Sequence, residues 1–363
     1  MPSASNGGFL RNCWYVCAFE HELTAHNFIS RRILGERVLF YVTRDGQPVA
    51  LEDRCPHRLV PLSYGRRKDD SIQCGYHGMV FATTGRCIHI PGQAEIPTTA
   101  KIRTYPIETR CGYHWIWMGD PSLAAKEEIP DVPWPTLPDW TTVKGYIHMP
   151  ADYRLVNDNL LDLSHETYVH EGTIGNAPSQ SIADFNPTVS VTDGSVQVAR
   201  EMEGVAPPPW FQMIMNTKDL IDRWQIASWT APSFNTTTTG GKRRGATKED
   251  GYIGRVLHML TPETQHSTHY FYSFSRNFRI SDKDLNEQLL RALSQTFDED
   301  KQLLALQQLE LVESGKTIPT VALRVDNGPL RARRILAARI RREIEGQAAS
   351  GDLQESTIVE FDT

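Results

Sequence analysis

The sequence contains no long apolar run, and no stretch approaches the roughly 20 consecutive apolar residues that span a bilayer. It also lacks an excess of positive charge, since 44 acidic residues outnumber 38 basic ones, which gives no reason to expect nucleic acid as a partner. The N-terminus lacks the basic-then-apolar order of a signal peptide. We therefore expect a cytoplasmic protein that binds neither membrane nor nucleic acid.

Two further absences narrow the class of protein. No internal repeat is present, and no G-x-G-x-x-G motif follows a predicted strand, so a nicotinamide site is not expected in this chain. The length of 363 residues suggests two domains, each large enough to bury its own core.

One group of metal-binding residues stands out in the first hundred. Cys55-Pro-His57 is followed by sixteen residues and then by Cys74-Gly-Tyr-His77. Two thiolates and two imidazoles suit either a tetrahedral zinc ion or a [2Fe–2S] cluster. Zinc sites usually pair ligands of like kind, whereas each half here supplies one Cys and one His, which favours the cluster. A hairpin predicted over Val38–Thr43 and Gln47–Glu52 leads into the first ligand loop.

A second group begins at Asp162-Leu-Ser-His165-Glu-Thr-Tyr-Val-His170. On a regular helix His165 and His170 lie about 140° apart, so they can share one ion only if the helix is distorted or ends between them. The alternative is that both histidines are structural. Two histidines need a carboxylate to complete the facial triad of a non-haem iron site.

That carboxylate is expected on a long amphipathic helix predicted from Ser281 to about Val312, with Ser281 and Asp284 as a capping-box-like start. Asp300 falls on its apolar stripe, whereas Asp298 and Glu299 point away from it. A carboxylate facing a core is costly unless it is paired or bound to metal, so Asp300 is the predicted third ligand. The alternative is an ion pair with a basic side chain. The stripe is formed by Leu285, Leu289, Leu293, Phe297 and Leu304.

Composition also predicts the domain boundary. Residues 1–120 form the first domain, closed by a strand at Tyr113–Met118, and residues 121–140 form a stiff proline-rich connector. Residues 141–347 form the second domain, and the polar tail 348–363 is expected to be disordered. The second domain is predicted to contain strands at Val189–Val198, Arg255–Leu260 and His269–Arg276. The fold class is therefore α+β, with an antiparallel sheet and helices on one side of it.

Two segments allow more than one interpretation. Residues 236–251, rich in Thr and Gly, are interpreted as a disordered surface loop, with a mobile lid over a pocket as the alternative. Leu330–Gln347 reads as a basic amphipathic helix, which either packs on the domain or docks an acidic electron donor.

The metal motifs resemble those of the Rieske non-haem iron oxygenases. The resemblance extends over nearly the whole chain, most closely to the group of vanillate O-demethylase, dicamba monooxygenase and toluenesulfonate methyl-monooxygenase. It implies an all-β Rieske domain followed by a helix-grip catalytic domain. It rests on Cys55-x-His57…Cys74-x₂-His77-Gly78, Asp162-x₂-His165-x₄-His170, Asn12-Cys-Trp-Tyr-Val-Cys-Ala18, Asp222-Arg-Trp-Gln225, Leu260-Thr-Pro-Glu263 and Ser275-Arg-Asn-Phe278.

The resemblance also implies cofactors and roles. A [2Fe–2S] cluster and a mononuclear Fe(II) are expected, with O₂ as co-substrate and electrons supplied from NADH by a separate flavin and iron–sulfur reductase. Asp162 would link an iron-site histidine to His77 of a neighbouring subunit in a homotrimer, and Asn159 would lie near the iron. His258 would contact the substrate acid, although a core histidine is the alternative. Arg291 is a further candidate, since its helical position lies near the apolar stripe and could face an anion.

Three hypotheses of function follow. The favoured one is the oxygenase component of a monooxygenase that hydroxylates a methyl or methoxy carbon of an aromatic carboxylate or sulfonate; a hydroxylated methoxy group then releases formaldehyde. The second is ring dihydroxylation at the same metal sites. The third is a Rieske electron carrier without catalysis, against which the histidine pair and the stripe-facing Asp300 both argue.

Overall fold

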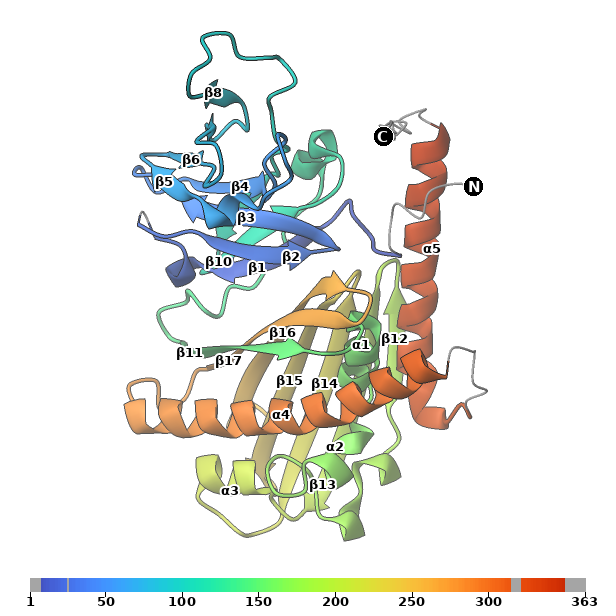
Figure 1. Cartoon of the computed structure of the whole chain (residues 1–363). Coiled ribbons are helices and arrows are strands. Elements are labelled where there is room, and N and C mark those ends of the chain that lie inside the picture. The colour runs from blue at the N-terminus through green and yellow to red at the C-terminus, as the bar shows by residue number, and fades with distance from the viewer. Residues whose placement is uncertain (1–7, 25, 315–320, 350–363) are drawn as a thin grey trace.

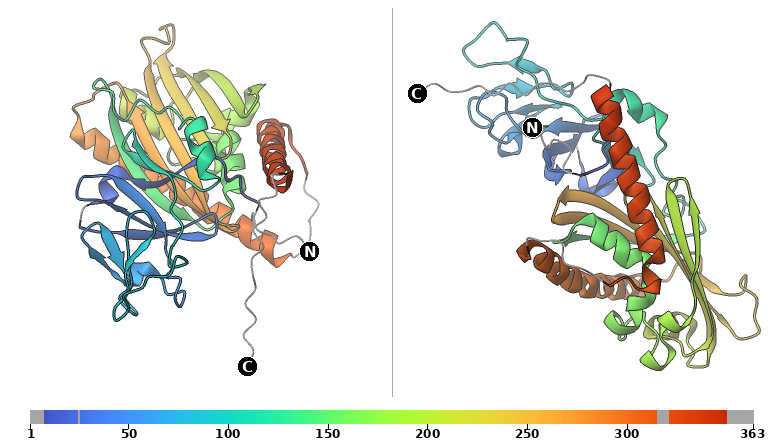
Figure 2. Two further views of the ribbon diagram at one scale, coloured as in Figure 1. Left: turned by 90° about the horizontal axis from the view of Figure 1, so that it is seen from above. Right: turned by 90° about the vertical axis from the view of Figure 1, so that its right-hand side faces the viewer.

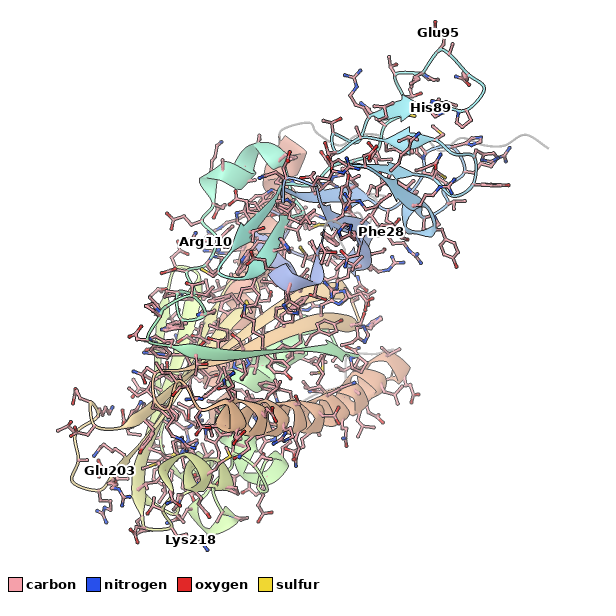
Figure 3. The ribbon with its side chains drawn as sticks, turned by 90° about the vertical axis from the view of Figure 1, so that its left-hand side faces the viewer. Phe28, His89, Glu95, Arg110, Glu203 and Lys218 are labelled. Atoms are coloured by element: carbon pink, nitrogen blue, oxygen red, sulfur yellow. The ribbon has the colours of Figure 1, made fainter. Side chains whose placement is uncertain are left out.

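A computed structural model describes residues 8–24, 26–314 and 321–349, which form two domains stacked end to end (Figure 1). The N-terminal domain is all-β, and the C-terminal domain is one antiparallel sheet with helices against it. The expected α+β fold class is therefore confirmed. Figure 3 places His89 and Glu95 at the outer end of the first domain and Glu203 and Lys218 at the opposite end of the second.

The N-terminal domain consists of three small antiparallel sheets, ordered β2-β3-β4, β1-β10-β9 and β5-β6-β7-β8. The predicted hairpin is β3 and β4, and the predicted closing strand is β10. The strands are β1 (Trp14–Phe19), β2 (Ile29–Ile33), β3 (Glu36–Val42), β4 (Pro48–Glu52), β5 (Arg66–Lys68), β6 (Ser71–Gln73), β7 (Val80–Phe81), β8 (Cys87–His89), β9 (Ile107–Arg110) and β10 (Tyr113–Trp117).

The C-terminal domain is a seven-stranded sheet in the order β11-β17-β16-β15-β14-β13-β12. Its strands are β11 (Thr141–Met149), β12 (Thr188–Thr192), β13 (Ser195–Val205), β14 (Ile221–Thr230), β15 (Phe234–Arg243), β16 (Tyr252–Thr264) and β17 (Ser267–Arg276). Its helices are α1 (Tyr153–Leu161), α2 (Glu166–Val169), α3 (Pro209–Met215), α4 (Lys283–Glu313) and α5 (Asn327–Ala349). The helices α1 to α4 lie on one face of the sheet, and α4 runs across it (Figures 1 and 2).

The two domains are joined by more than the connector. The N–H groups of Leu34 and Gly35 donate to the carbonyls of Pro262 and Glu263 on β16, at 2.8 and 2.9 Å. The helix α5 extends beside both domains (Figure 2), and the Glu343 carboxylate near its end accepts hydrogen bonds from the first domain. The connector itself is packed rather than free, since Ala124, Ile129 and Val132 are buried with Trp14 and Trp117.

Three predictions of local structure were wrong. Residues 236–243 of the predicted loop or lid belong to β15 in the interior of the sheet, because β-branched threonines favour strands and Gly241 leaves room for the Phe211 ring, whereas residues 244–251 do form a loop. Residues 189–198 are not one strand, since Asp193-Gly194 turns the chain between β12 and β13. The cap of α4 is Asp282, whose carboxylate accepts from the N–H of Leu285 at 2.9 Å, not Ser281.

The basic amphipathic helix predicted at 330–347 is α5, which still includes Ala348 and Ala349; the rest of the predicted tail lies outside the described residues. In the part of the chain that the structure describes, no helix has the length and apolar character to cross a bilayer.

Candidate metal centres and substrate cavity

Two loops of the N-terminal domain, residues 55–60 and 74–79, have the same backbone design. In each loop the N–H of the leading cysteine donates to the carbonyl five residues later, Cys55 to Val60 and Cys74 to Met79, at 2.9 and 2.8 Å. Each loop also has a residue with positive φ four positions after its cysteine, Leu59 in one and Gly78 in the other. The two loops therefore present their ligands as a matched pair.

The four side chains sort into a sulfur side and a nitrogen side. Cys55 and Cys74 are buried next to each other, and burial raises the pKa of Cys55 to about 11, so two thiolates there need a positive partner. His57 and His77 are exposed, with ring centroids 4.5 Å apart. A tetrahedral zinc site requires one ligand atom from each of these four residues to surround a single ion. Among the described residues, these four side chains do not form such a group. The arrangement fits a two-iron cluster with one iron on each side.

The second ligand group depends on a break in the chain after α1. Asp152 caps α1 at its start, and the apolar Leu155, Val156 and Leu160 bury one face of it. At its end the Asp162 carboxylate accepts from the N–H of Ser164 at 3.0 Å, which starts a separate 3-10 turn at Leu163–His165. The short helix α2 follows and ends at Val169, with His170 as its C-cap. This is the helix distortion that a shared ion requires.

The structure brings His165, His170 and Asp300 together. One ligand atom from each lies within 4.8 Å of the others, and no other such set of three is found among the described residues. The Asp300 carboxylate is 3.4 Å from Nε2 of His165 and 3.2 Å from Nε2 of His170. Asn159 on α1 donates to the same carboxylate at 3.0 Å. Two imidazoles and one carboxylate with an open side fit a mononuclear non-haem iron.

The outer nitrogen of each imidazole is also held. Nδ1 of His165 is 2.5 Å from the backbone carbonyl of Asp162, and Nδ1 of His170 is 2.7 Å from the Glu299 carboxylate. Hydrogen bonds from Nδ1–H leave the Nε2 lone pairs free for a metal. Glu299 was predicted to point away from the apolar stripe of the helix, and its contact with His170 was not foreseen; its side chain reaches sideways from α4 to His170.

Electrostatics also favour a cation here. Burial alone lowers the pKa of His165, but the hydrogen bond and charge of Asp300 outweigh it and raise that pKa to about 9. The pKa of His170 is raised by the same carboxylate, also against burial. Burial would raise the pKa of Asp300, yet the two imidazoles hold it well below its usual range. Each ionised group is stabilised by the opposite charge beside it. A divalent ion can replace the additional protons on the two imidazoles.

Asp162 contacts His165 through its backbone carbonyl and not through its carboxylate. That carboxylate accepts from Ser164 Oγ at 2.6 Å and lies 3.8 Å from the buried Arg200 guanidinium. It is one-fifth exposed, so one side of it remains open at the surface.

His165, His170 and Asp300 form part of the wall of a cavity of about 70 Å³ between the sheet and the helices. Its polar wall also includes Asn159, Glu166, Arg223, Gln225, Thr237, Thr239, His258 and Thr296. Its apolar wall consists of Leu160, Leu163, Ile174, Trp210, Phe211, Val256, Phe274, Leu293 and Phe297. Four aromatic rings and a few fixed polar groups suit a flat aromatic ligand.

The two predicted substrate residues have different outcomes. His258 lines the cavity, and both its ring nitrogens have partners: Tyr270 OH at 2.6 Å and Thr237 Oγ1 at 3.1 Å. Burial lowers its pKa to about 3, so it is neutral. Arg291 was a wrong prediction, since it is exposed on the outer side of α4, 3.5 Å from Glu287, and does not line the cavity.

A buried ion pair in the cavity wall was missed by the sequence analysis. The Glu166 carboxylate, one residue after His165, lies 3.7 Å from the Arg223 guanidinium, and both are almost fully buried. Gln225 donates to both oxygens of Glu166. Arg223 and Gln225 are two apart on one strand, so the sequence could indicate that they share a face of the sheet. It could not indicate that Glu166 contacts both of them.

Comparison with known proteins agrees with this geometry. Residues 13–106 match the Rieske [2Fe-2S] domain, and residues 149–342 match the vanillate O-demethylase oxygenase C-terminal domain. The iron–sulfur subunit of the toluene-4-sulfonate monooxygenase system of Comamonas testosteroni is 34% identical, over 94% of this chain and 99% of that one. The vanillate O-demethylase oxygenase subunit of a Pseudomonas species is 34% identical, over 90% and 94%.

Among solved structures, dicamba monooxygenase bound to 3,6-dichlorosalicylic acid has a TM-score of 0.87 and 32% identity, over 93% of this chain and 99% of that one. A resident cluster and a mononuclear non-haem iron are features of such enzymes, so the electron-carrier hypothesis is set aside. The chain belongs to the Rieske non-haem iron oxygenases, in the vanillate O-demethylase group.

Proposed function

We propose that this oxygenase hydroxylates a methyl or methoxy carbon of an aromatic carboxylate or sulfonate. The observation that carries the proposal is the convergence of His165, His170 and Asp300 on the wall of an aromatic cavity. A flat substrate against the cavity rings would lie beside the iron. Attack on a methoxy carbon would release formaldehyde and a phenol.

Within this proposal His165, His170 and Asp300 hold the iron, which when bound supplies the activation of dioxygen. Asn159 holds the Asp300 carboxylate in place through its 3.0 Å hydrogen bond. Glu299 and the Asp162 carbonyl fix the outward nitrogens of the two imidazoles. These contacts preserve the ligand geometry while the apolar wall excludes water.

The acid group of the substrate is proposed to meet Thr237 and His258. Because His258 is neutral and hydrogen-bonded on both nitrogens, it recognises an anion by hydrogen bonding through the Thr237 hydroxyl rather than by charge. The cavity wall also carries the Glu166 carboxylate, which repels an anion. The acid therefore points away from Glu166.

Electrons are proposed to enter at the cluster held by Cys55, His57, Cys74 and His77, from a flavin and iron–sulfur reductase that oxidises NADH. The imidazoles of His57 and His77 are exposed. The part of the N-terminal domain around β5 and β6, from which the cluster loops extend, lies far from α2 in the same chain (Figure 1). We therefore propose a homotrimer in which the open side of the Asp162 carboxylate meets His77 of the partner subunit. The cytoplasm suits this chemistry, because NADH is available there and the four cysteines other than Cys55 and Cys74 are free thiols.

The test is oxygen uptake with a surrogate reductase across methoxybenzoates, methylbenzenesulfonates and unsubstituted aromatic acids, with formaldehyde trapped. Formaldehyde equal to the substrate consumed would establish demethylation. A hydroxymethyl product without formaldehyde would establish methyl hydroxylation. A cis-dihydrodiol from any of these acids would favour ring dihydroxylation and refute the proposal.

A further inference from the structure

Asp53 places a carboxylate at a core position of the N-terminal domain. Leu51, Asp53 and Cys55 alternate along the chain at and beyond the end of β4 and are buried, whereas Glu52 and Arg54 between them lie closer to solvent. Asp53 is 1% exposed, and it is the one buried carboxylate among the described residues of this domain. A buried acid is costly unless its surroundings stabilise it, so its partners require an explanation.

The partners of this carboxylate close the first ligand loop, residues 55–60. One oxygen accepts from the N–H of Ser63 at 2.7 Å, and the other accepts from Ser63 Oγ at 2.7 Å and from Ser30 Oγ at 2.6 Å. Ser63 follows the loop and Ser30 lies on β2, so the carboxylate joins both ends of the loop to the neighbouring sheet. The second ligand loop is closed by the pairing of β6 with β7 instead, so a buried charge is particular to the first loop.

The charge of this carboxylate is not neutralised by an ion pair. Arg54 and Arg103 line the same surface groove as Asp53. Their guanidinium groups pair with Glu52 and Glu36 instead, and Asp53 forms no ion pair with any of the described residues. Its three donors are a backbone N–H and two hydroxyls, all uncharged, which stabilise the ionised form without cancelling its charge. A net negative charge therefore remains at the base of the ligand loop.

A charge in this position acts on the proposed cluster ligands. Asp53 precedes Cys55 by two residues, so their Cα atoms lie at most roughly 7 Å apart. Reduction adds one negative charge to a [2Fe–2S] cluster, and a fixed negative charge nearby opposes it. With an effective dielectric constant of about 20, two unit charges roughly 10 Å apart shift an equilibrium by on the order of tenfold. The two imidazole ligands act in the opposite direction, because the replacement of thiolates by imidazoles raises the reduction potential.

We propose that Asp53 is a positioning residue that lowers the reduction potential of the cluster through its buried charge while it closes the first ligand loop. A lower potential makes the reduced cluster a stronger electron donor to the mononuclear iron. The inference rests on the proposed cluster ligands and is independent of the substrate class. The iron content and visible spectrum of the wild type test those ligands separately.

The experiment is an anaerobic redox titration of the whole holoenzyme, followed by the EPR signal of the reduced cluster. Asp53→Asn keeps the shape of the side chain and its hydrogen bonds to the two serines, and it removes the charge. At the potential where half of the wild-type cluster is reduced, the ratio of reduced to oxidised cluster should rise about tenfold in the variant. The visible spectrum of the oxidised cluster should not change. An unchanged ratio overturns the inference.

Two controls separate the charge from the shape of the loop. Asp45→Asn is the same substitution on the exposed turn between β3 and β4, and it should leave the ratio unchanged. Ser63→Ala removes the hydroxyl donor to Asp53 and keeps the charge, so it should not raise the ratio. A rise in either control as large as that in Asp53→Asn would assign the effect to something other than the buried charge and would overturn the inference.

A second removal of the charge covers the case in which Asp53→Asn assembles no cluster. Asp53→Ser is smaller and leaves space for a water molecule between Ser30 and Ser63, and it should also raise the ratio of reduced to oxidised cluster. If neither variant holds a cluster while Asp45→Asn does, Asp53 serves only the assembly of the loop, and its role in the reduction potential is refuted.

Discussion

The two ligand groups of this chain are built by opposite means. The proposed cluster ligands come from two six-residue loops that close on themselves, and their imidazoles are exposed. The proposed iron ligands come from a broken helix and from α4, more than a hundred residues later, and they line a buried cavity. The first group is local and open, which suits electron entry. The second is long-range and enclosed, which suits chemistry that water must not reach.

The largest expected effect breaks the enclosed group and leaves the open one intact. Asp300→Ala removes the carboxylate on which both histidines converge, so the mononuclear iron should be lost and turnover should fall by at least about a hundredfold. The cluster loops are not involved, so the visible spectrum of the cluster should not change. Iron analysis should fall from about three atoms per chain to about two. Retention of the third iron together with turnover would refute the assignment of Asp300.

The next prediction concerns the connection between the two groups. Asp162→Asn keeps the backbone carbonyl that holds His165, and it changes only the carboxylate that is open at the surface. Both cofactors should remain, and turnover should fall at least about tenfold because the proposed hydrogen bond to the neighbouring subunit is weakened. The measurement is reoxidation of the reduced cluster in a single turnover with substrate and O₂. A normal reoxidation rate would rule out the bridging role.

A smaller effect is expected from the loss of the carboxylate that accepts a hydrogen bond from His170. Glu299→Gln weakens the hydrogen bond that fixes His170, so the iron should bind about 10- to 100-fold more weakly while the cluster stays unchanged. Asp298→Asn is the matched control, one residue earlier on α4 and exposed. Iron affinity is measured by competition with a chelator. Equal iron affinity in the two variants would show that the contact of Glu299 with His170 does not strengthen iron binding.

Glu299 also illustrates what the sequence could predict and what it could not. The candidate cluster ligands could be proposed from the sequence because their spacing is local, and Asp300 could be proposed because it lies on an apolar helical stripe. The role of Glu299 depends on a partner 129 residues away, which no periodicity records. The same limit hid the contact of Glu166 with Arg223 and Gln225.

The fold was predicted well where patterns alternate, and less well where composition misled. The Thr- and Gly-rich stretch after Phe234 resembled a loop in composition, yet its threonines pair along both edges of β15. Its glycines are there because Trp224 and Phe211 pack where a Cβ would be. Such a reason is visible only once the neighbouring strand and helix are in place.

A pH effect is expected from the buried histidine of the cavity wall. Burial lowers the pKa of His258 to about 3 in the folded protein, against about 6.5 when unfolded. Its contribution to stability is therefore complete above about pH 6.5 and is lost as the pH falls toward 3. At pH 5 the loss is on the order of 2 kcal/mol. Urea denaturation gives the free energy of unfolding of the wild type and of His258→Phe at pH 7 and pH 5. The other titrating groups affect both proteins alike, so the difference between the two proteins isolates the contribution of His258. An equal pH dependence in the two proteins would contradict the burial argument.

The smallest effect is predicted for Arg291, whose side chain is 69% exposed on the outer face of the helix that carries Asp300. Its ion pair with Glu287 is exposed to solvent, so Arg291→Ala should change the free energy of unfolding by less than about 0.5 kcal/mol. Leu293→Ala, two residues later on the buried face, should cost about 2 to 5 kcal/mol. Iron content and kcat/KM should be unchanged in Arg291→Ala. A raised KM for aromatic acids but not for neutral aromatics would mean that the outer face of α4 also recognises the anion, so the enclosed site would extend beyond its cavity.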